Sequence, residues 1–153
     1  FSEGSSNLQS LSFVANRAIR GGGLYTDIHS LTATSSLLQS NTATNPSYGG
    51  GGLYAAGGRS NLSSLTIVAN TSGSRGGGIL TVASHTLTAT NSLLQNNTAT
   101  TNGGGLYAES GLSNLSSLTI VGNSGFWGGG IHTTGSHNLT ATSSVLQSNT
   151  ATS

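Results

Sequence analysis

Residues 93–110 read LLQNNTATTNGGGLYAES, and close copies of this phrase recur along the chain. The phrase joins an apolar start, two asparagines, a threonine-rich middle, three glycines and an apolar and aromatic end. Internal copies at a regular spacing are typical of proteins that are built from stacked repeats. The period of this repeat therefore decides the fold class.

The repeats align on a large apolar residue that is followed three positions later by asparagine. The six asparagines are Asn16, Asn41, Asn70, Asn97, Asn123 and Asn149, and the steps between them are 25, 29, 27, 26 and 26 residues. Every asparagine except the last is followed by a glycine run and an apolar residue, as at residues 103–106. The chain is thus predicted to contain about six units of about 26 residues.

Each unit carries three apolar columns, on short segments that turn residues separate. Alternation such as Leu65-Thr66-Ile67 is typical of a strand with one buried side. Glycine provides unusual backbone angles at corners and allows neighbouring coils to approach closely. The pattern predicts an all-β parallel solenoid, in which stacked coils bury a face that no single coil can bury alone. We assign one column to Leu8, Leu31, Leu62, Leu87, Leu115 and Leu139.

The stacked asparagines are expected to form a structural ladder, in which each side chain bonds a corner of the backbone and its copy in the next coil. A longer period is also present, because the position two residues before the apolar anchor alternates between leucine and serine. It is occupied by Leu11, Ser36, Leu65, Ser92, Leu118 and Ser144. The repeating unit is therefore a pair of coils of about 53 residues, which is typical of a rod rather than of an enzyme.

The phrase FVANRAIRGGGLY at residues 13–25 resembles the repeats of the chlamydial polymorphic outer membrane proteins, whose hallmarks are FxxN and GGA followed by Ile, Leu or Val. The resemblance covers essentially the whole chain, in six FxxN-like and five GGA-like positions. It implies a right-handed parallel β-helix at a cell surface, with an adhesive or structural role. Two features depart from the family pattern: a third glycine replaces the usual alanine, and most anchors are leucine or isoleucine.

The composition excludes several partners. Of the 153 residues only 5% are charged, and the net charge is +1. Binding of nucleic acid needs clustered Lys and Arg, whereas this chain has four scattered arginines and no lysine. No apolar run approaches the length of a membrane span. Small polar residues in this abundance are also found in disordered chains, but the strict phasing of the apolar residues favours a fold.

Groups for catalysis or metal binding are not expected to converge. Glu3 and Glu109 occupy matching positions about four coils apart, roughly 19 Å at the spacing of stacked strands, and we place Asp27 on a different segment. Three histidines share one sequence context: His29, His85 and His137. Copies two coils apart are separated by about 10 Å, which is too far for one metal ion. We therefore expect no enzyme, no cofactor and no metal site.

Ice binding is one alternative role, because recurring Thr-x-Thr pairs are similar to the flat arrays of ice-binding solenoids. The pairs are Thr32/Thr34, Thr88/Thr90, Thr140/Thr142, Thr42/Thr44, Thr98/Thr100 and Thr150/Thr152. They recur on alternate coils only. The intervening coils carry Arg17, or Ser124 and Gly125, near the same place, which is expected to interrupt a flat lattice.

Glycan binding is the other alternative role, in which an adhesin would use an aromatic column of Tyr25, Tyr54 and Tyr107. His132 stands in this column where the other repeats have tyrosine. Phe126 and Trp127 lie at a predicted corner, where they either cap a face or form a sticky patch. An exposed aromatic column would favour the adhesin.

Covalent glycans are a further expectation. Sequons of the type Asn-x-Ser/Thr occur at Asn61, Asn70, Asn96, Asn114 and Asn138. Asn70 and Asn96 fall at or beside the ladder, so the possible sites are Asn61, Asn114 and Asn138. A protein with so little charge needs another source of solubility, which glycans provide.

The sequence as a whole predicts a single β-solenoid over residues 1–153, either a piece of a longer array or a protomer that stacks head-to-tail on copies of itself. The expected function is a structural extracellular or cell-surface filament, rod or stalk. Its expected partners are further copies of the chain and covalent glycans, with no nucleic acid and no membrane span.

Overall fold

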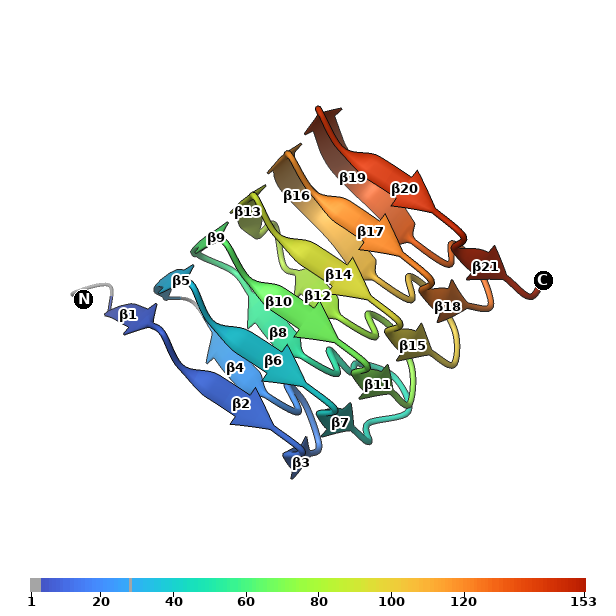
Figure 1. Cartoon of the computed structure of the whole chain (residues 1–153), viewed down its shortest axis with the longest axis horizontal. Helices are drawn as coiled ribbons and strands as arrows, with labels where there is room; N and C mark the ends of the chain where they lie inside the picture. Colours follow the sequence, from blue (N-terminus) through green and yellow to red (C-terminus); the bar gives the residue numbers. More distant parts are fainter. Residues whose placement is uncertain (1–3, 28) are drawn as a thin grey trace.

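The computed structural model describes residues 4–27 and 29–153, and its strands stack along one axis as a β-solenoid of six coils (Figure 1). Within these residues all regular secondary structure is β-strand, and every strand pairing is parallel. The repeat forces this arrangement, because successive copies place equivalent residues one above another. The predicted parallel β-solenoid of about six coils is confirmed.

Three parallel sheets form the walls of the solenoid. The first has nine strands: β1 (Ser5–Gln9), β4 (Leu24–Asp27), β5 (Ser30–Thr34), β8 (Leu53–Ala56), β9 (Arg59–Ser63), β12 (Ile79–Val82), β13 (Thr86–Thr90), β16 (Leu106–Ser116) and β19 (Ile131–Thr142). The second contains β2 (Ser12–Val14), β6 (Leu37–Gln39), β10 (Thr66–Val68), β14 (Leu93–Gln95), β17 (Thr119–Val121) and β20 (Val145–Gln147). The third contains β3 (Arg17–Ala18), β7 (Thr42–Ala43), β11 (Thr71–Ser72), β15 (Thr98–Ala99), β18 (Ser124–Gly125) and β21 (Thr150–Ala151).

The first sheet bends into two arms. The tyrosine arm consists of β4, β8, β12 and the first halves of β16 and β19, and the threonine arm consists of β1, β5, β9, β13 and the second halves of β16 and β19. Coils are numbered here by their strands: β1–β3 form coil 1, β4–β7 coil 2, β8–β11 coil 3, β12–β15 coil 4, β16–β18 coil 5 and β19–β21 coil 6. The two arms place two different outer faces on the rod.

One continuous apolar core fills the interior. Its fully buried members come from both arms of the first sheet and from the second sheet, for example Leu53 from the tyrosine arm, Leu87 from the threonine arm and Ile67 from the second sheet. Strand alternation explains this, because every second side chain points inward. The outward side chains are mostly Ser, Thr, Asn and Gln, so the surface carries little charge.

The predicted leucine column of the threonine arm is wrong in its register. Leu8 pairs with Ala33, whereas Leu31 pairs with Ser6, two residues earlier in coil 1. The arm therefore has two inward columns. They are Leu8, Ala33, Leu62, Ala89, Leu115 and Ala141, and Ser6, Leu31, Ser60, Leu87, Ser113 and Leu139. Each coil contributes one leucine and one small residue in alternating order, so a large side chain packs over a small one of the next coil.

The glycine runs form the tight corner between the third sheet and the tyrosine arm. Gly103, at the start of one run, has a φ of 65°, which favours glycine. Gly78, at the end of another run, lies so close to the next coil that an added Cβ would be 2.6 Å from the Gly105 carbonyl oxygen and 3.2 Å from the Asn97 side chain. A third glycine in place of the family's alanine therefore allows the backbone to approach the asparagine column.

Candidate functional site

The six asparagines of the predicted ladder stack in one column. Each rung repeats the same bonds: the backbone N–H and Nδ2 of Asn70 donate to Asn97 Oδ1 at 3.0 Å, and Asn97 Nδ2 donates to the Ile67 carbonyl at 2.9 Å. The bonds continue from Asn16 to Asn149 through every coil. The column connects each coil to the next at the corner where the second and third sheets meet, so its role is structural.

The sequons divide by exposure. Asn61, Asn114 and Asn138 are exposed on the threonine arm, whereas Asn70 is fully buried in the ladder. Asn96 is exposed beside the ladder and has a φ of 53°. The geometry thus allows a glycan on the three expected residues and forbids one on Asn70.

The threonine pairs lie on two different faces. Thr32/Thr34, Thr88/Thr90 and Thr140/Thr142 point outward from the threonine arm, and the coils between them carry small polar residues at the same positions, such as Asn61 and Ser63. The expectation that Arg17, Ser124 or Gly125 interrupts the array is wrong for this face, because those residues belong to the third sheet. On the third sheet Thr71 fills a coil between Thr42 and Thr98.

The carboxylates are placed differently from the prediction. Asp27 pairs with Ala56, Ala56 pairs with Val82, and Val82 lies next to Glu109 because the preceding residues Thr81 and Ala108 are paired. Asp27 therefore belongs to the same column as Glu109 and not to a different segment, an error that arose because the corner after each strand varies in length. Three coils separate the two, about 14 Å at the spacing of stacked strands. Glu3 lies outside the described residues.

The three histidines lie in different environments. His85 is fully buried, its Nε2 lies 3.0 Å from Ser60 Oγ, and its Nδ1 bonds the Gly57 carbonyl. Burial lowers the pKa of His85, and this effect exceeds the opposite effect of the Gly57 hydrogen bond. His137 repeats the contact with Ser113 at 3.1 Å, and His29 is exposed. In the described part of the chain no three His, Cys, Asp or Glu residues gather as a metal site would need.

The aromatic column is largely covered. Tyr25 is 45% exposed, but Tyr54 and Tyr107 are only 5% and 2% exposed. Tyr25 stacks on Tyr54 with ring centroids 5.0 Å apart, and Tyr107 stacks on His132 at 5.6 Å. Burial raises the pKa of Tyr54 and of Tyr107. The exposed aromatic column that would favour an adhesin is thus present only at Tyr25.

Arginines and a further tyrosine cover this column. Arg20 Cζ lies 5.8 Å from the Tyr54 ring centroid and 5.9 Å from that of Tyr48. Arg75 Cζ lies 5.3 Å from the Tyr48 centroid and 5.2 Å from that of Tyr107, and Arg75 also pairs with Glu109 at 3.1 Å. Burial and the positive charge of Arg75 lower the pKa of His132.

The covering residues were missed in the sequence. Tyr48 belongs to the segment Asn45–Tyr48, in which Asn45 Oδ1 accepts the backbone N–H groups of Ser47 and Tyr48 at 2.8 Å. This segment lengthens the second step of the repeat to 29 residues, and that departure from 26 was the available signal.

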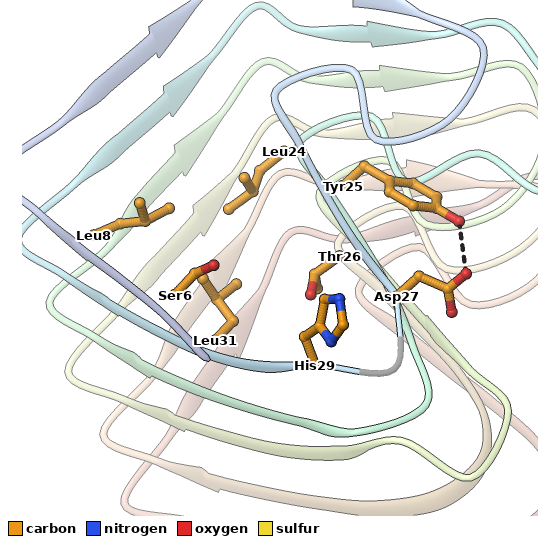
Figure 2. Close-up of a pocket in the computed structure, with 8 residues that line it drawn as sticks. All are labelled: Ser6, Leu8, Leu24, Tyr25, Thr26, Asp27, His29 and Leu31. Carbon is orange, nitrogen blue, oxygen red and sulfur yellow. Dashed lines mark hydrogen bonds between the residues drawn. The ribbon is translucent and has the colours of Figure 1, made fainter. Parts of the chain in front are cut away.

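Two hollows border Tyr25. One of about 380 Å³ lies over the tyrosine arm between Asp27 and Glu109, with Ala56 and Val82 among its lining residues. The other, of about 290 Å³, opens at coil 1 beside Leu8, Leu24 and Leu31 (Figure 2). Figure 2 shows Tyr25 and Asp27 on the opposite side of β4 from Leu24, and the Tyr25 hydroxyl donates to Asp27 Oδ2 at 3.2 Å.

Phe126 and Trp127 form an exposed pair at the corner between the third sheet and the tyrosine arm. Their ring centroids are 5.0 Å apart in an edge-to-face arrangement, and the two side chains are 42% and 52% exposed. An exposed pair does not cap the interior. It forms a small apolar patch, as one of the two sequence interpretations expected.

Comparison with known proteins supports the repeat assignment. Residues 91–109 match the family model of the Chlamydia polymorphic membrane protein repeat, which confirms the resemblance seen in the sequence. The matched segment begins directly after β13 and contains β14, Asn97 of the ladder, β15, the glycine corner and the start of β16. No curated protein and no solved structure matched the chain.

The repeat and the fold together suggest a surface repeat protein. Across residues 4–27 and 29–153, no helix is long and apolar enough to cross a bilayer.

Proposed function

We propose that this chain is a non-catalytic structural module, a rod that forms part of a stalk or filament at a cell surface. The observation that carries the proposal is continuity: three sheets and the asparagine ladder run through all six coils, so hydrogen bonds repeat along the axis at every level. Such a stack resists extension along its axis, because each coil is bonded to the next over its whole outline. The surface location rests on the match to a membrane-protein repeat.

Head-to-tail stacking is supported by the alternation of the two coil types, which a second copy would continue. Coil 1 is of the type that carries leucine at the alternating position, and coil 6 is of the type that carries serine. A second copy placed on coil 6 would continue the alternation, with Leu11 over Ser144 and Asn16 over Asn149.

Electron microscopy tests this stacking. We expect negative-stain images of the chain to show filaments that lengthen with concentration. Leu146→Lys, which places a charge in the apolar end of coil 6, should abolish them. Val145→Lys is the matched control, because the neighbouring side chain is equally exposed, 51% against 53%, but lies on the outer face of the second sheet. Short rods at all concentrations, or filaments that persist in Leu146→Lys, would contradict self-assembly.

Glycans on Asn61, Asn114 and Asn138 are part of the proposed function. All three are exposed on the threonine arm, and they would supply the solubility that the scarce charge does not. Intact mass spectrometry of the protein from its native source, before and after enzymatic release of N-glycans, measures this directly. A mass equal to that of the unmodified chain would rule the glycans out.

Ice binding is the second candidate, favoured by the regular outer face of the threonine arm. Its middle column reads Asn7, Thr32, Asn61, Thr88, Asn114 and Thr140. Neighbouring coils are about 4.8 Å apart along this uncharged column. Glycans on Asn61 and Asn114 would cover it, so the two proposals exclude each other. Thermal hysteresis that is lost in Thr88→Lys and kept in Thr66→Lys, on the second sheet, would establish ice binding.

A further inference from the structure

Many of the residues that the repeat does not copy lie on one face of the rod, the tyrosine arm. Arg20, Asp27, Arg75 and Glu109 are four of the seven charged residues of the chain, and all four lie here. The extra segment that carries Tyr48 also folds onto this face. A rod needs only one cross-section repeated, so a cluster of unrepeated residues indicates a role beyond support.

The cluster is a continuous stack of planar groups along the rod axis. It begins with Tyr25 on Tyr54, passes through Arg20, Tyr48 and Arg75, and ends with Tyr107 on His132. In coil 4 the column holds Leu80 in place of an aromatic ring, and Tyr48 packs against the apolar cluster that contains this leucine. The stack therefore bridges the missing ring and brings the Arg20 and Arg75 guanidinium groups close to the tyrosine rings.

The hollow of about 380 Å³ lies beside this stack. Its lining joins an apolar part, Ala56 and Val82, to the aromatic side chain of Tyr25 and to polar groups of both signs. Arg20 and Asp27 are exposed, and the Asp27 carboxylate accepts a hydrogen bond from the Tyr25 hydroxyl. Glu109, at the other end, is held by Arg75 and by the Tyr107 hydroxyl at 3.3 Å. Fixed partners on each carboxylate keep the acceptor oxygens in place.

We propose that this hollow binds a neutral saccharide of one or two rings. A sugar ring has a C–H face that packs on an aromatic ring and a rim of hydroxyls that both donate and accept. The hollow supplies each counterpart: the Tyr25 ring, the Arg20 guanidinium as donor and the Asp27 carboxylate as acceptor. Arg20 and Asp27 line the hollow with opposite charges, and Glu109 is neutralised by its ion pair with Arg75, which disfavours an anionic ligand. A purely apolar ligand would desolvate these charges without compensation. The volume falls in the range of small-molecule sites.

The site differs from a row of exposed tyrosines along the rod. Tyr54 and Tyr107 are buried and form its support, and only Tyr25 and the half-buried Tyr48 offer a ring at the hollow. Each chain would therefore bind one short segment of a glycan and not a long polymer. The proposal does not depend on filament formation, because every residue of the hollow comes from coils 1 to 5 of one chain.

A glycan array carrying neutral, sialylated and sulfated oligosaccharides, followed by calorimetric titration of the strongest binder, tests the proposal. We expect neutral glycans to bind. Arg20→Gln and Tyr25→Ala should each weaken binding by about tenfold or more, the usual effect of losing a hydrogen bond to a charged group or an aromatic contact. Arg17→Gln is the matched control, an exposed arginine three positions earlier whose strand belongs to the third sheet, and it should change affinity less than about twofold.

Asp27→Asn keeps the shape of the side chain and removes its charge, so it separates loss of binding from loss of folding. Its thermal unfolding should match that of the parent chain while its affinity falls. Absence of binding to any glycan, binding of anionic glycans alone, or neutral binding that survives both Arg20→Gln and Tyr25→Ala would overturn the proposal. None of these outcomes bears on the filament, which microscopy tests separately.

Discussion

At the scale of single residues, the asparagine ladder concentrates the polar bonding of the interior. A buried amide needs partners for its donors and its acceptor, and here each side chain supplies both to the neighbouring coils. The adjacent position, which carries Asn96 in coil 4, is exposed and is occupied by alanine in two other coils, at Ala15 and Ala69. We therefore expect Asn97 to be important for stability and its neighbour Asn96 to contribute little.

We predict that Asn97→Ala lowers the free energy of unfolding by about 3 kcal/mol or more. The substitution leaves the backbone N–H and the side-chain amide of Asn70 without their acceptor, and each buried orphan costs about 1–3 kcal/mol. Asn96→Ala, the neighbouring control, should cost less than about 1 kcal/mol. Chemical denaturation of the two variants measures both values. Equal losses would show that the ladder contributes nothing beyond local backbone preference.

His85 makes the folded state sensitive to acid. Because burial lowers the pKa of His85 below its usual value of 6.5, the unfolded chain binds a proton on this residue that the folded chain does not. The free energy of unfolding should therefore fall as the pH drops below about 6.5 and stay level above it. Denaturation at several pH values measures the slope. His85→Gln should reduce it, with a remainder from His132, and an unchanged slope would contradict the assignment.

At the scale of the strand, alternation between coils is the main feature of the core. Leucine and a small residue exchange places from one coil to the next on the threonine arm, and leucine alternates with serine at the corner that follows. The serine of that corner also has a bonding role, since Ser92 Oγ accepts the Leu65 N–H at 3.0 Å and donates to the Thr90 carbonyl at 2.7 Å. The two-coil period thus reflects how neighbouring coils pack on each other.

Exchanging the two inward residues of one strand tests this packing. The double variant Leu87→Ala with Ala89→Leu keeps the composition of β13, but it places a leucine between Leu62 and Leu115 and a cavity between Ser60 and Ser113. We expect a loss of about 3 kcal/mol or more, because a cavity costs about 2–5 kcal/mol and overpacking adds to it. Thermal and chemical unfolding measure the change. A neutral result would mean that coils pack independently of their neighbours.

At the scale of the whole molecule, stability comes from backbone ladders and apolar packing and hardly from charge. Within the described ranges, 4–27 and 29–153, the structure shows one ion pair, between Arg75 and Glu109, and it is partly exposed. Exposed pairs of this kind contribute about 0–1 kcal/mol. A rod with these properties should tolerate large changes in ionic strength.

We therefore predict that raising sodium chloride from a low to a molar concentration changes the free energy of unfolding by less than about 1 kcal/mol. The reason is that salt mainly screens interactions between charges, and these contribute little here. Denaturation curves at the two concentrations provide the measurement, and Arg75→Gln serves as a control that removes the ion pair. A strong salt dependence in the parent chain would contradict this prediction, because it would require stabilising charge interactions beyond the ion pair between Arg75 and Glu109.

Much of this architecture is predictable from the sequence, because it is copied in every repeat. The spacing of Asn97 from its copies predicted the coil length, and the glycine runs predicted the corners. The leucine column of the threonine arm was predicted to face the interior, which is correct, but in the wrong register. The corner before them varies in length between coils, and the bulge at Glu109 and Gly111 is one example. Alignment of residue types between repeats cannot decide how two strands pair across such a corner.

The sequence by itself determined the parallel solenoid, its six coils and its asparagine column, since these depend on period and on residue type alone. Only the tertiary structure decided which residues of different coils share a face. Asp27 and Glu109 belong to one column, three coils apart, because hydrogen bonding between strands sets the register. Arg20, Tyr48 and Arg75 cover the tyrosines, because an inserted segment folds onto its neighbours. The candidate site depends on the tertiary structure in the same way, because it adds Arg20, Asp27 and Tyr48, which the repeat does not copy, to the repeated tyrosines.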